Sequence, residues 1–205
     1  MKTRPVRFAT ATTAVLAIGM LAGGCGSQHA EDASASSHSG AQSGKAHEHH
    51  AGMTMDMSDM NGPSEPAAMI CSHETRDAVR RTFDLTSAPR SSDRWDKQQM
   101  LYACWYDVHG SRLTLSVYDA MDAESGRRWF DRLRSQLTGA HRIRGVQGLG
   151  FPSYQSARGQ VIFLKDGKTL DVDARRLPAS ALPKGFTRTE AAYGVASAVV
   201  ACWTE

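Results

Sequence analysis

The sequence predicts an α+β fold: an antiparallel four-stranded sheet made of two hairpins, with about three helices packed on one of its faces. Two segments alternate apolar and polar residues on either side of a short turn, which is typical of hairpins. Three other segments repeat their apolar residues at helical spacing. The first 66 residues show neither pattern, so we expect a single domain over residues 67–205 after a disordered N-terminal tether.

The first predicted helix begins near Ser72 and runs through the segment RDAVRRTF, whose apolar residues fall on one side. Two strands follow, over residues 100–108 and 112–118, and they are joined at His109 and Gly110. The second strand alternates apolar and polar side chains, which indicates that one of its faces is buried. Its apolar residues are Leu113, Leu115 and Val117.

The second predicted helix begins after Asp122 and ends near Gly139, a residue type that often terminates helices. A loop through the segment GVQGLGFPSYQ then leads to the second hairpin, in residues 159–174. Two β-rich runs flank the dipeptide Asp166–Gly167 in this hairpin. Both residue types accept the positive φ angles of a tight turn, so the turn is placed there.

The last predicted helix starts at Thr187, which has the spacing of a capping box with Glu190. Phe186 is placed to pack against Ala191 as a hydrophobic staple. Apolar residues then recur on one side, and we expect this stripe to face the core. The stripe consists of Ala192, Val195, Ala196, Val199 and Val200.

Residues 1–24 are predicted to be a signal peptide. A basic start with Lys2, Arg4 and Arg7 precedes an apolar core of nine residues, numbered 14–22. A membrane-spanning helix needs about 20 apolar residues, so this segment is too short to remain in the membrane. It therefore indicates export of the protein followed by removal of the signal.

The small residues before Cys25 resemble a bacterial lipobox, although Leu21 stands four residues before the cysteine and that motif usually has leucine three before. The resemblance implies that Cys25 is lipidated and anchors the mature chain at the extracellular side of the cell membrane. Residues 25–66 would then form the tether between the anchor and the domain. The alternative is plain secretion, with an incidental cysteine at this position.

The charge of the chain argues against nucleic acid as a partner. The full sequence has 24 basic and 21 acidic residues, a formal charge of +3. Residues 1–24 hold three of the basic residues and none of the acidic ones, so the mature chain is formally neutral. Neither the balance of charge nor the exported location suits a nucleic-acid-binding protein.

The remaining cysteines indicate one disulfide in an oxidising compartment. If Cys25 carries lipid, Cys71, Cys104 and Cys202 remain. We favour a bond between Cys71 and Cys104, which would tie the first helix to the first strand, although the sequence alone does not fix the connectivity. Cys202 would then be left over on the last helix, most simply as a buried and inert thiol.

The arrangement of a lipobox, a polar tether, a cysteine that opens a helix (Cys71) and a Cys104–Trp105 pair in the first strand is similar to a group of actinobacterial lipoproteins. That group is known only as a domain of unknown function. The segment GLGFPSY before the second hairpin also resembles its pattern. The resemblance implies a cysteine-paired α+β domain over most of residues 67–205, and it supplies no catalytic residues. The His/Met-rich part of the tether is not part of the group's pattern.

The tether holds a cluster of possible metal ligands. Thioethers favour Cu(I), and imidazoles bind copper and zinc, so a chain that carries both can wrap several donors around one copper ion. We therefore predict copper as the bound metal, held by His47, His49, His50, Met53, Met55, Met57 and Met60. Another metal, or no metal with the methionines acting as oxidant sinks, is the alternative.

No catalytic constellation is apparent, and we do not expect an enzyme. His73, His109 and His141 are widely separated and are interpreted as surface or turn residues. The predicted function is that of a lipid-anchored protein that buffers copper or passes it to a copper-handling partner protein. The alternative is a surface interaction or ligand-sensing module in which the tether is only a spacer.

Overall fold

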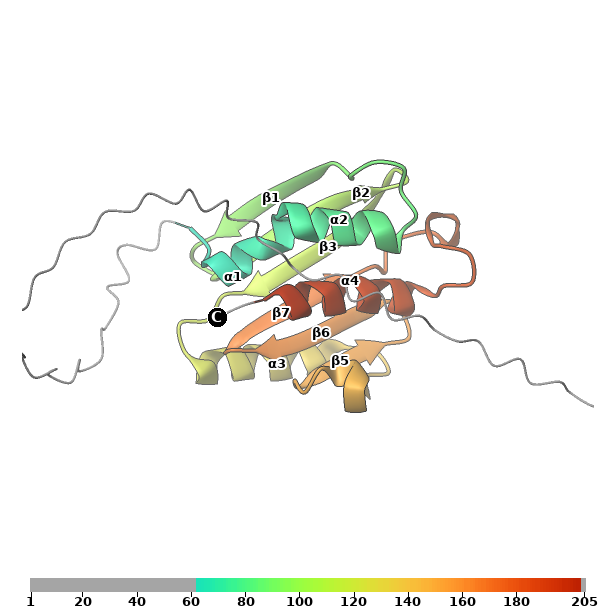
Figure 1. The fold of residues 1–205 in the computed structure, drawn as a ribbon. Coiled ribbons are helices and arrows are strands. Elements are labelled where there is room, and N and C mark those ends of the chain that lie inside the picture. The colour runs from blue at the N-terminus through green and yellow to red at the C-terminus, as the bar shows by residue number, and fades with distance from the viewer. Residues whose placement is uncertain (1–61, 204–205) are drawn as a thin grey trace, which may run out of the picture. The chain divides into compact units, whose positions relative to one another are not determined.

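The computed structural model describes residues 62–203, which form one seven-stranded antiparallel sheet with helices on both faces (Figure 1). The strand order is β1-β2-β3-β7-β6-β5-β4. The strands are β1 (Ser91–Asp96), β2 (Leu101–Val108), β3 (Ser111–Tyr118), β4 (His141–Arg142), β5 (Ser153–Ser156), β6 (Gln160–Lys165) and β7 (Lys168–Asp173). The α-helices of the described residues are α1 (Glu65–Ala68), α2 (His73–Thr82), α3 (Ala123–Gln136) and α4 (Arg188–Cys202). Short 3-10 turns are η2 (Met69–Cys71), η3 (Gly145–Gly148) and η4 (Ala179–Ala181).

The predicted four-stranded sheet is therefore wrong, because β1, β4 and β5 extend it at its two edges. The residues of β1 read SSDRWD and those of β4 only HR, so neither shows a run of alternating apolar residues. β5 lies at the end of the segment that was expected to be a loop. Edge strands bury less side-chain surface than central ones, and the hydrophobic pattern that identifies a strand is correspondingly weak in them.

The prediction that the helices share one face of the sheet is also wrong. The inward side chains of β2, β3 and β7 join those of α2 and α4 in one large core. α3 packs on the opposite face, where Phe130 and Leu137 meet Ile162 and Leu164. Strand β6 is apolar on both faces because it lies between these two layers, and such a strand reads as a continuous apolar run.

Two tight turns connect the strands of the hairpins β2–β3 and β6–β7. His109 and Gly110 have φ angles of 50° and 77° between β2 and β3, and Asp166 and Gly167 have φ angles of 49° and 73° between β6 and β7. Positive φ at both central residues matches the right-handed twist of the flanking strands. The register then places Leu115 opposite both Cys104 and Val172, so the central strands align their buried residues in rows.

α4 begins with the predicted capping box: the Thr187 side chain accepts a hydrogen bond from the Glu190 amide, and the Glu190 carboxylate accepts one from the Thr187 amide. The expected apolar stripe of α4 is buried in the large core. Phe186 is 48% exposed, so the expected staple leaves half of its ring in solvent.

The fold begins earlier than the predicted boundary at residue 67. The Ser64 side chain caps α1, and its amide and hydroxyl donate hydrogen bonds of 2.6 and 2.8 Å to the Asp119 carboxylate. Asp119 is only 2% exposed and also binds the Lys168 ammonium at 2.6 Å. Residues 64–66 therefore belong to the domain and not to the tether.

Candidate functional site

The predicted lipidation site and copper ligands lie outside the described residues, as do the predicted signal peptide and the predicted tether up to residue 61. These site residues are Cys25, His47, His49, His50, Met53, Met55, Met57 and Met60. Within residues 62–203, no group of three or more His, Cys, Asp or Glu side chains is placed to hold a metal ion. No helix of that part of the chain is long and apolar enough to cross a membrane.

Cys71 and Cys104 form a disulfide, as predicted, which ties η2 to the centre of β2. The bond closes a loop with a sequence separation of 33, and cross-links of this length stabilise a fold by about 3–4 kcal/mol. Nearby, the buried hydroxyl of Tyr106 donates a 2.7 Å hydrogen bond to the Ile70 carbonyl. Burial of this hydroxyl raises the pKa of Tyr106 well above its usual range. Cys202 is half-buried and is not a free thiol, so the expectation of an unpaired cysteine there is wrong.

Half of the sheet has one face that the described helices leave uncovered. Along β2 and β3, every second residue is buried under α2 and α4, and the residues between them point to the opposite side. α3 covers that side over β6 and β7, and it reaches β3 only at the end of the strand, where Trp129 stacks on Tyr118. We call the uncovered part over β1, β2 and β3 the open face. By the strand register it is made of Ser92, Arg94, Asp96, Leu101, Ala103, Trp105, Asp107, Arg112, Thr114, Ser116 and Tyr118.

One end of the open face is a hollow of about 370 Å³ around Trp105. The Arg112 guanidinium lies over the Trp105 ring, 5.6 Å from its centroid. The register brings these residues together, because Trp105 pairs with Thr114 and Arg112 lies two residues before Thr114 on the same face. At the rim of this hollow, Arg90 binds the Asp107 carboxylate at 3.0 Å. We call this site the Trp105 hollow.

The other end of the open face is a hollow of about 460 Å³ between β3 and α3. The rings of Tyr118 and Trp129 stack there with centroids 4.5 Å apart and an angle of 8° between their planes. The Arg132 guanidinium lies 5.3 Å from the centroid of Trp129. We call this site the Tyr118 hollow. Each end of the open face thus combines a half-buried aromatic ring with an arginine.

Three arginines of this region have no carboxylate partner among residues 62–203. Arg94, Arg112 and Arg132 form no ion pair there, whereas the neighbouring Arg128 binds Glu124. Arg112 and Arg132 are largely exposed and rest on the tryptophan rings described above. A guanidinium that stacks on an aromatic ring keeps its N–H groups free to bind a carboxylate. The open face can therefore bind a ligand that carries both apolar and acidic groups.

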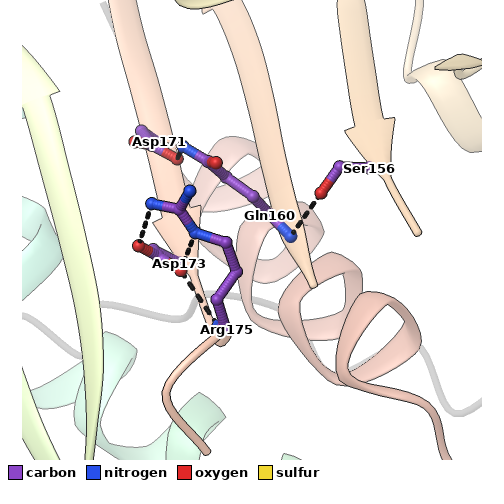
Figure 2. Close-up of polar contacts among 5 residues, drawn as sticks. All are labelled: Ser156, Gln160, Asp171, Asp173 and Arg175. Atoms are coloured by element: carbon purple, nitrogen blue, oxygen red, sulfur yellow. Dashed lines mark hydrogen bonds and ion pairs between the residues drawn. The ribbon is translucent and has the colours of Figure 1, made fainter. Parts of the chain in front are cut away.

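A polar cluster lies where the open face meets β6 and β7 (Figure 2). The side-chain amide of Gln160 donates to both oxygens of Asp171, at 3.0 and 2.9 Å, and its backbone amide donates to the Ser156 hydroxyl. Asp173 binds the Arg175 guanidinium through both oxygens. Burial raises the pKa of Asp171 to about 7, the Gln160 hydrogen bond opposes this shift, and the Asp173 charge adds to it.

A third hollow, of about 440 Å³, lies at the start of α4. Its walls come from β4, β5 and the first turns of α4, and they include His141, Gln155, Thr187 and Tyr193. The Tyr193 hydroxyl is already bound to the Gln147 carbonyl at 2.9 Å. The Glu190 amide at the helix start is also occupied, by the Thr187 side chain of the capping box. The hollow has the size of a small-molecule site. The side chains of His141, Gln147 and Gln155 line it and form no hydrogen bond within residues 62–203.

The three histidines of the domain lie far apart in the fold. His73 is in the first turn of α2, His109 is in the β2–β3 turn, and His141 is in β4 at the edge of the sheet. All three are exposed, in agreement with their interpretation as surface or turn residues.

Sequence reasoning predicted neither hollow of the open face. Trp105 and Arg112 are seven positions apart, and the register of β2 and β3 brings them together. Tyr118 and Trp129 meet only because α3 folds back over the sheet. The one signal in the sequence was the mixture of arginine and tryptophan in the segment RRWFDRLR, which alone is also typical of a solvated helix surface.

Comparisons of the chain with protein-family models, curated proteins and solved structures found no match in any of the three.

Proposed function

We propose that this chain is a lipid-anchored protein on the extracellular side of the cell membrane that captures copper through its His/Met segment, residues 47–61. The observation that carries the proposal is the density of soft donors: three histidines and four methionines within 14 residues, 47–60. Thioethers bind Cu(I) without losing a proton, so their affinity does not fall in acidic surroundings. The protein would buffer the metal or deliver it to a copper-handling partner.

The domain contributes a fixed attachment point for this segment. The last donor, Met60, stands four residues before Ser64, which is hydrogen-bonded to the buried Asp119. At about 3.3–3.6 Å per residue, Met60 can lie no farther than about 14 Å from Ser64. Met60 is therefore held close to the domain, and a copper ion that it binds would lie near the domain surface.

A competition titration with a chromogenic Cu(I) chelator tests the proposal. We expect the mature chain, expressed without residues 1–24, to withdraw one Cu(I) from the chelator. A variant with Met53, Met55, Met57 and Met60 replaced by Ser should bind at least tenfold more weakly, because thioethers are the soft donors. The matched control is Met121→Ser, which removes an exposed methionine of the domain, 40% exposed. Equal affinity of the four-site variant and the control would exclude copper capture by the segment.

The second candidate function is ligand sensing by the domain, with the tether as a spacer. The observation that favours it is the hollow at the start of α4, where His141 and Gln155 offer free polar groups beside apolar walls. Deletion of residues 27–61 distinguishes the two functions. Loss of copper tolerance in cells that carry the deletion supports copper capture. Retention of copper tolerance, together with loss of a ligand-dependent response after a Gln155→Ala change, supports sensing.

A further inference from the structure

We propose that the His/Met segment of this chain docks on the open face of its own domain. Its methionines would rest in the Trp105 and Tyr118 hollows, and its carboxylates would bind the arginines between and beside them. The docking is measured without metal and does not depend on the proposed function. Only its competition with copper, described below, rests on that function.

The position where the segment joins the domain supports this occupant. Ser64 is bound to Asp119, and Asp119 directly follows Tyr118 in the chain. The segment therefore joins the fold at the end of β3, next to the Tyr118 hollow. Met57 stands seven residues before Ser64, which gives a reach of about 25 Å, enough to enter that hollow. A tethered segment is also present at an effective concentration in the millimolar range, so weak contacts suffice.

The spacing of the methionines matches the spacing of the hollows. Tyr118 and Thr114, the partner of Trp105, are four residues apart on β3, which corresponds to about 13 Å along the strand. Met53 and Met57 are also four residues apart, so an extended segment places their thioethers about 13 Å apart and on the same side. A segment that runs along β3 can thus place Met57 near Tyr118 and Met53 near Trp105.

The chemistry of the two surfaces is complementary. The segment has three acids (Glu48, Asp56, Asp59) and no lysine or arginine. The open face and its rim have three arginines without a carboxylate partner among the described residues: Arg94, Arg112 and Arg132. Methionine sulfur also makes favourable contacts with aromatic rings, and the tryptophan and tyrosine rings of the hollows are half-buried and partly accessible. Between the hollows lie the small residues Ala103, Thr114 and Ser116, which leave room for a chain to pass.

Docking and copper binding would use the same thioethers, so each would oppose the other. A copper ion that recruits Met53 and Met57 withdraws them from the aromatic rings and releases the segment from the domain. By linkage, a variant that cannot dock should bind copper more tightly. Its copper affinity should rise by the factor 1 + K, where K is the ratio of docked to undocked segment in the metal-free parent chain.

Methyl NMR of the metal-free mature chain, labelled with ¹³C at the methionine methyl groups, tests the docking. We expect the signals of Met53 and Met57 to be displaced from the random-coil position by the ring currents of the aromatic residues. In the triple variant Arg94→Ser, Arg112→Ser and Arg132→Ser, the rings remain but the carboxylate contacts are lost. The displacement should then fall at least threefold, and 1 M salt should have a similar effect.

The matched control replaces Arg81, Arg144 and Arg158 by Ser, which changes the charge equally at exposed positions away from the open face. The signals of Met69, Met100 and Met121 report whether each variant is folded. Random-coil signals for Met53 and Met57 in the unmodified chain would overturn the proposal, and so would an equal loss in both triple variants. Displacements that vanish on dilution would also overturn it, in favour of a second copy of the chain as the occupant.

Discussion

At the scale of single residues, Asp171 is a carboxyl group whose pKa the fold raises toward neutral pH. It lies in β7, where it pairs with Ser116 of β3 on one side and with Ile162 of β6 on the other. Burial raises the pKa of Asp171 to about 7, even though Gln160 donates two hydrogen bonds to it. The domain therefore holds a carboxyl that is about half protonated at neutral pH.

The raised pKa has a defined effect on stability. In the unfolded chain Asp171 ionises near pH 3.8, whereas in the fold it stays protonated up to about pH 7. The folded state thus binds more protons between these values, and stability is lost as the pH rises through this interval. Asp171→Asn keeps an acceptor for Gln160 and removes the ionisation. We expect the variant to equal the parent below pH 4 and to be more stable at pH 8, by roughly 2 kcal/mol, from about 1.4 kcal/mol per pKa unit reduced by partial solvent screening.

Urea denaturation of both proteins at several pH values between 3.5 and 8 measures this difference. The comparison removes the contributions of the other carboxyl groups, such as Asp107 and Asp122, whose pKa values are lowered by hydrogen bonds and which act in the opposite direction. A difference that does not change with pH would show that Asp171 ionises normally in the fold.

At the scale of elements, the contact between α3 and the β6–β7 turn determines how closely the helix approaches the sheet. Gly126, in the first turns of α3, lies directly against the backbone of Gly167, and a Cβ at Gly126 would overlap the Gly167 carbonyl oxygen. The Thr169 hydroxyl also donates a 3.2 Å hydrogen bond to the Gly126 carbonyl. The absence of a side chain at Gly126 thus allows α3 to cover β6 and β7.

Gly126→Ala should destabilise the domain by about 2–4 kcal/mol, because α3 must move away from the turn and expose Phe130. Helix propensity alone predicts the opposite, a gain of up to about 1 kcal/mol. Gly194→Ala in α4 is the matched control, since its Cβ would meet Thr82 at 3.4 Å, an ordinary contact. Thermal unfolding of the two variants should give shifts of opposite sign. A gain of stability in both would exclude the close approach of α3.

Whether an element of the fold could be predicted depended on whether its signal is local in the sequence. The hairpins β2–β3 and β6–β7 were predictable because their information is local: alternating apolar residues and turn dipeptides such as Asp166–Gly167 that accept positive φ. The face on which α3 packs was not, because it depends on the second apolar row of β6, Ile162 and Leu164. Strand β1 was missed because SSDRWD has no apolar alternation, and it pairs only because β2 offers a free edge.

Some parts of the candidate site could likewise be predicted from the sequence, and others could not. Counting the cysteines expected in an exported domain predicted one disulfide, and the favoured pair Cys71–Cys104 is the one that the structure forms, although the sequence alone did not fix the pairing. The His/Met segment is visible in the sequence as a cluster of one chemical type, whereas its proposed binding surface is not. That surface depends on the register that brings Arg112 over Trp105 and on the helix packing that brings Trp129 onto Tyr118. Contacts between distant segments leave no local pattern to recognise.

At the scale of the whole molecule, the hydrogen bonds of Ser64 to Asp119 attach the first described residues to the domain. Asp119 is 2% exposed, so loss of these donors leaves part of a buried carboxylate without partners. The cost of an unsatisfied buried acceptor is about 1–3 kcal/mol.

Deletion of residues 27–66 should therefore lower the free energy of unfolding by about 1–3 kcal/mol more than deletion of residues 27–61, which keeps Ser64. Ser64→Ala in the chain expressed without residues 1–24 should account for most of the loss, since it removes the hydroxyl donor and the cap of α1. Denaturant unfolding of the three proteins provides the measurement. Equal stability of the two deletions would place the start of the fold after residue 66.

The β6–β7 turn holds both ends of the described chain. Lys168 binds Asp119, which holds Ser64, and across the turn Lys165 donates a hydrogen bond to the backbone carbonyl of Trp203. The first and last described residues therefore lie toward the same end of the sheet (Figure 1). A mechanical load applied through the two termini would act on these two lysine contacts first and would spread little shear through the seven strands. Such a domain can be joined end to end by a short linker, and cut open elsewhere, without a change in its topology.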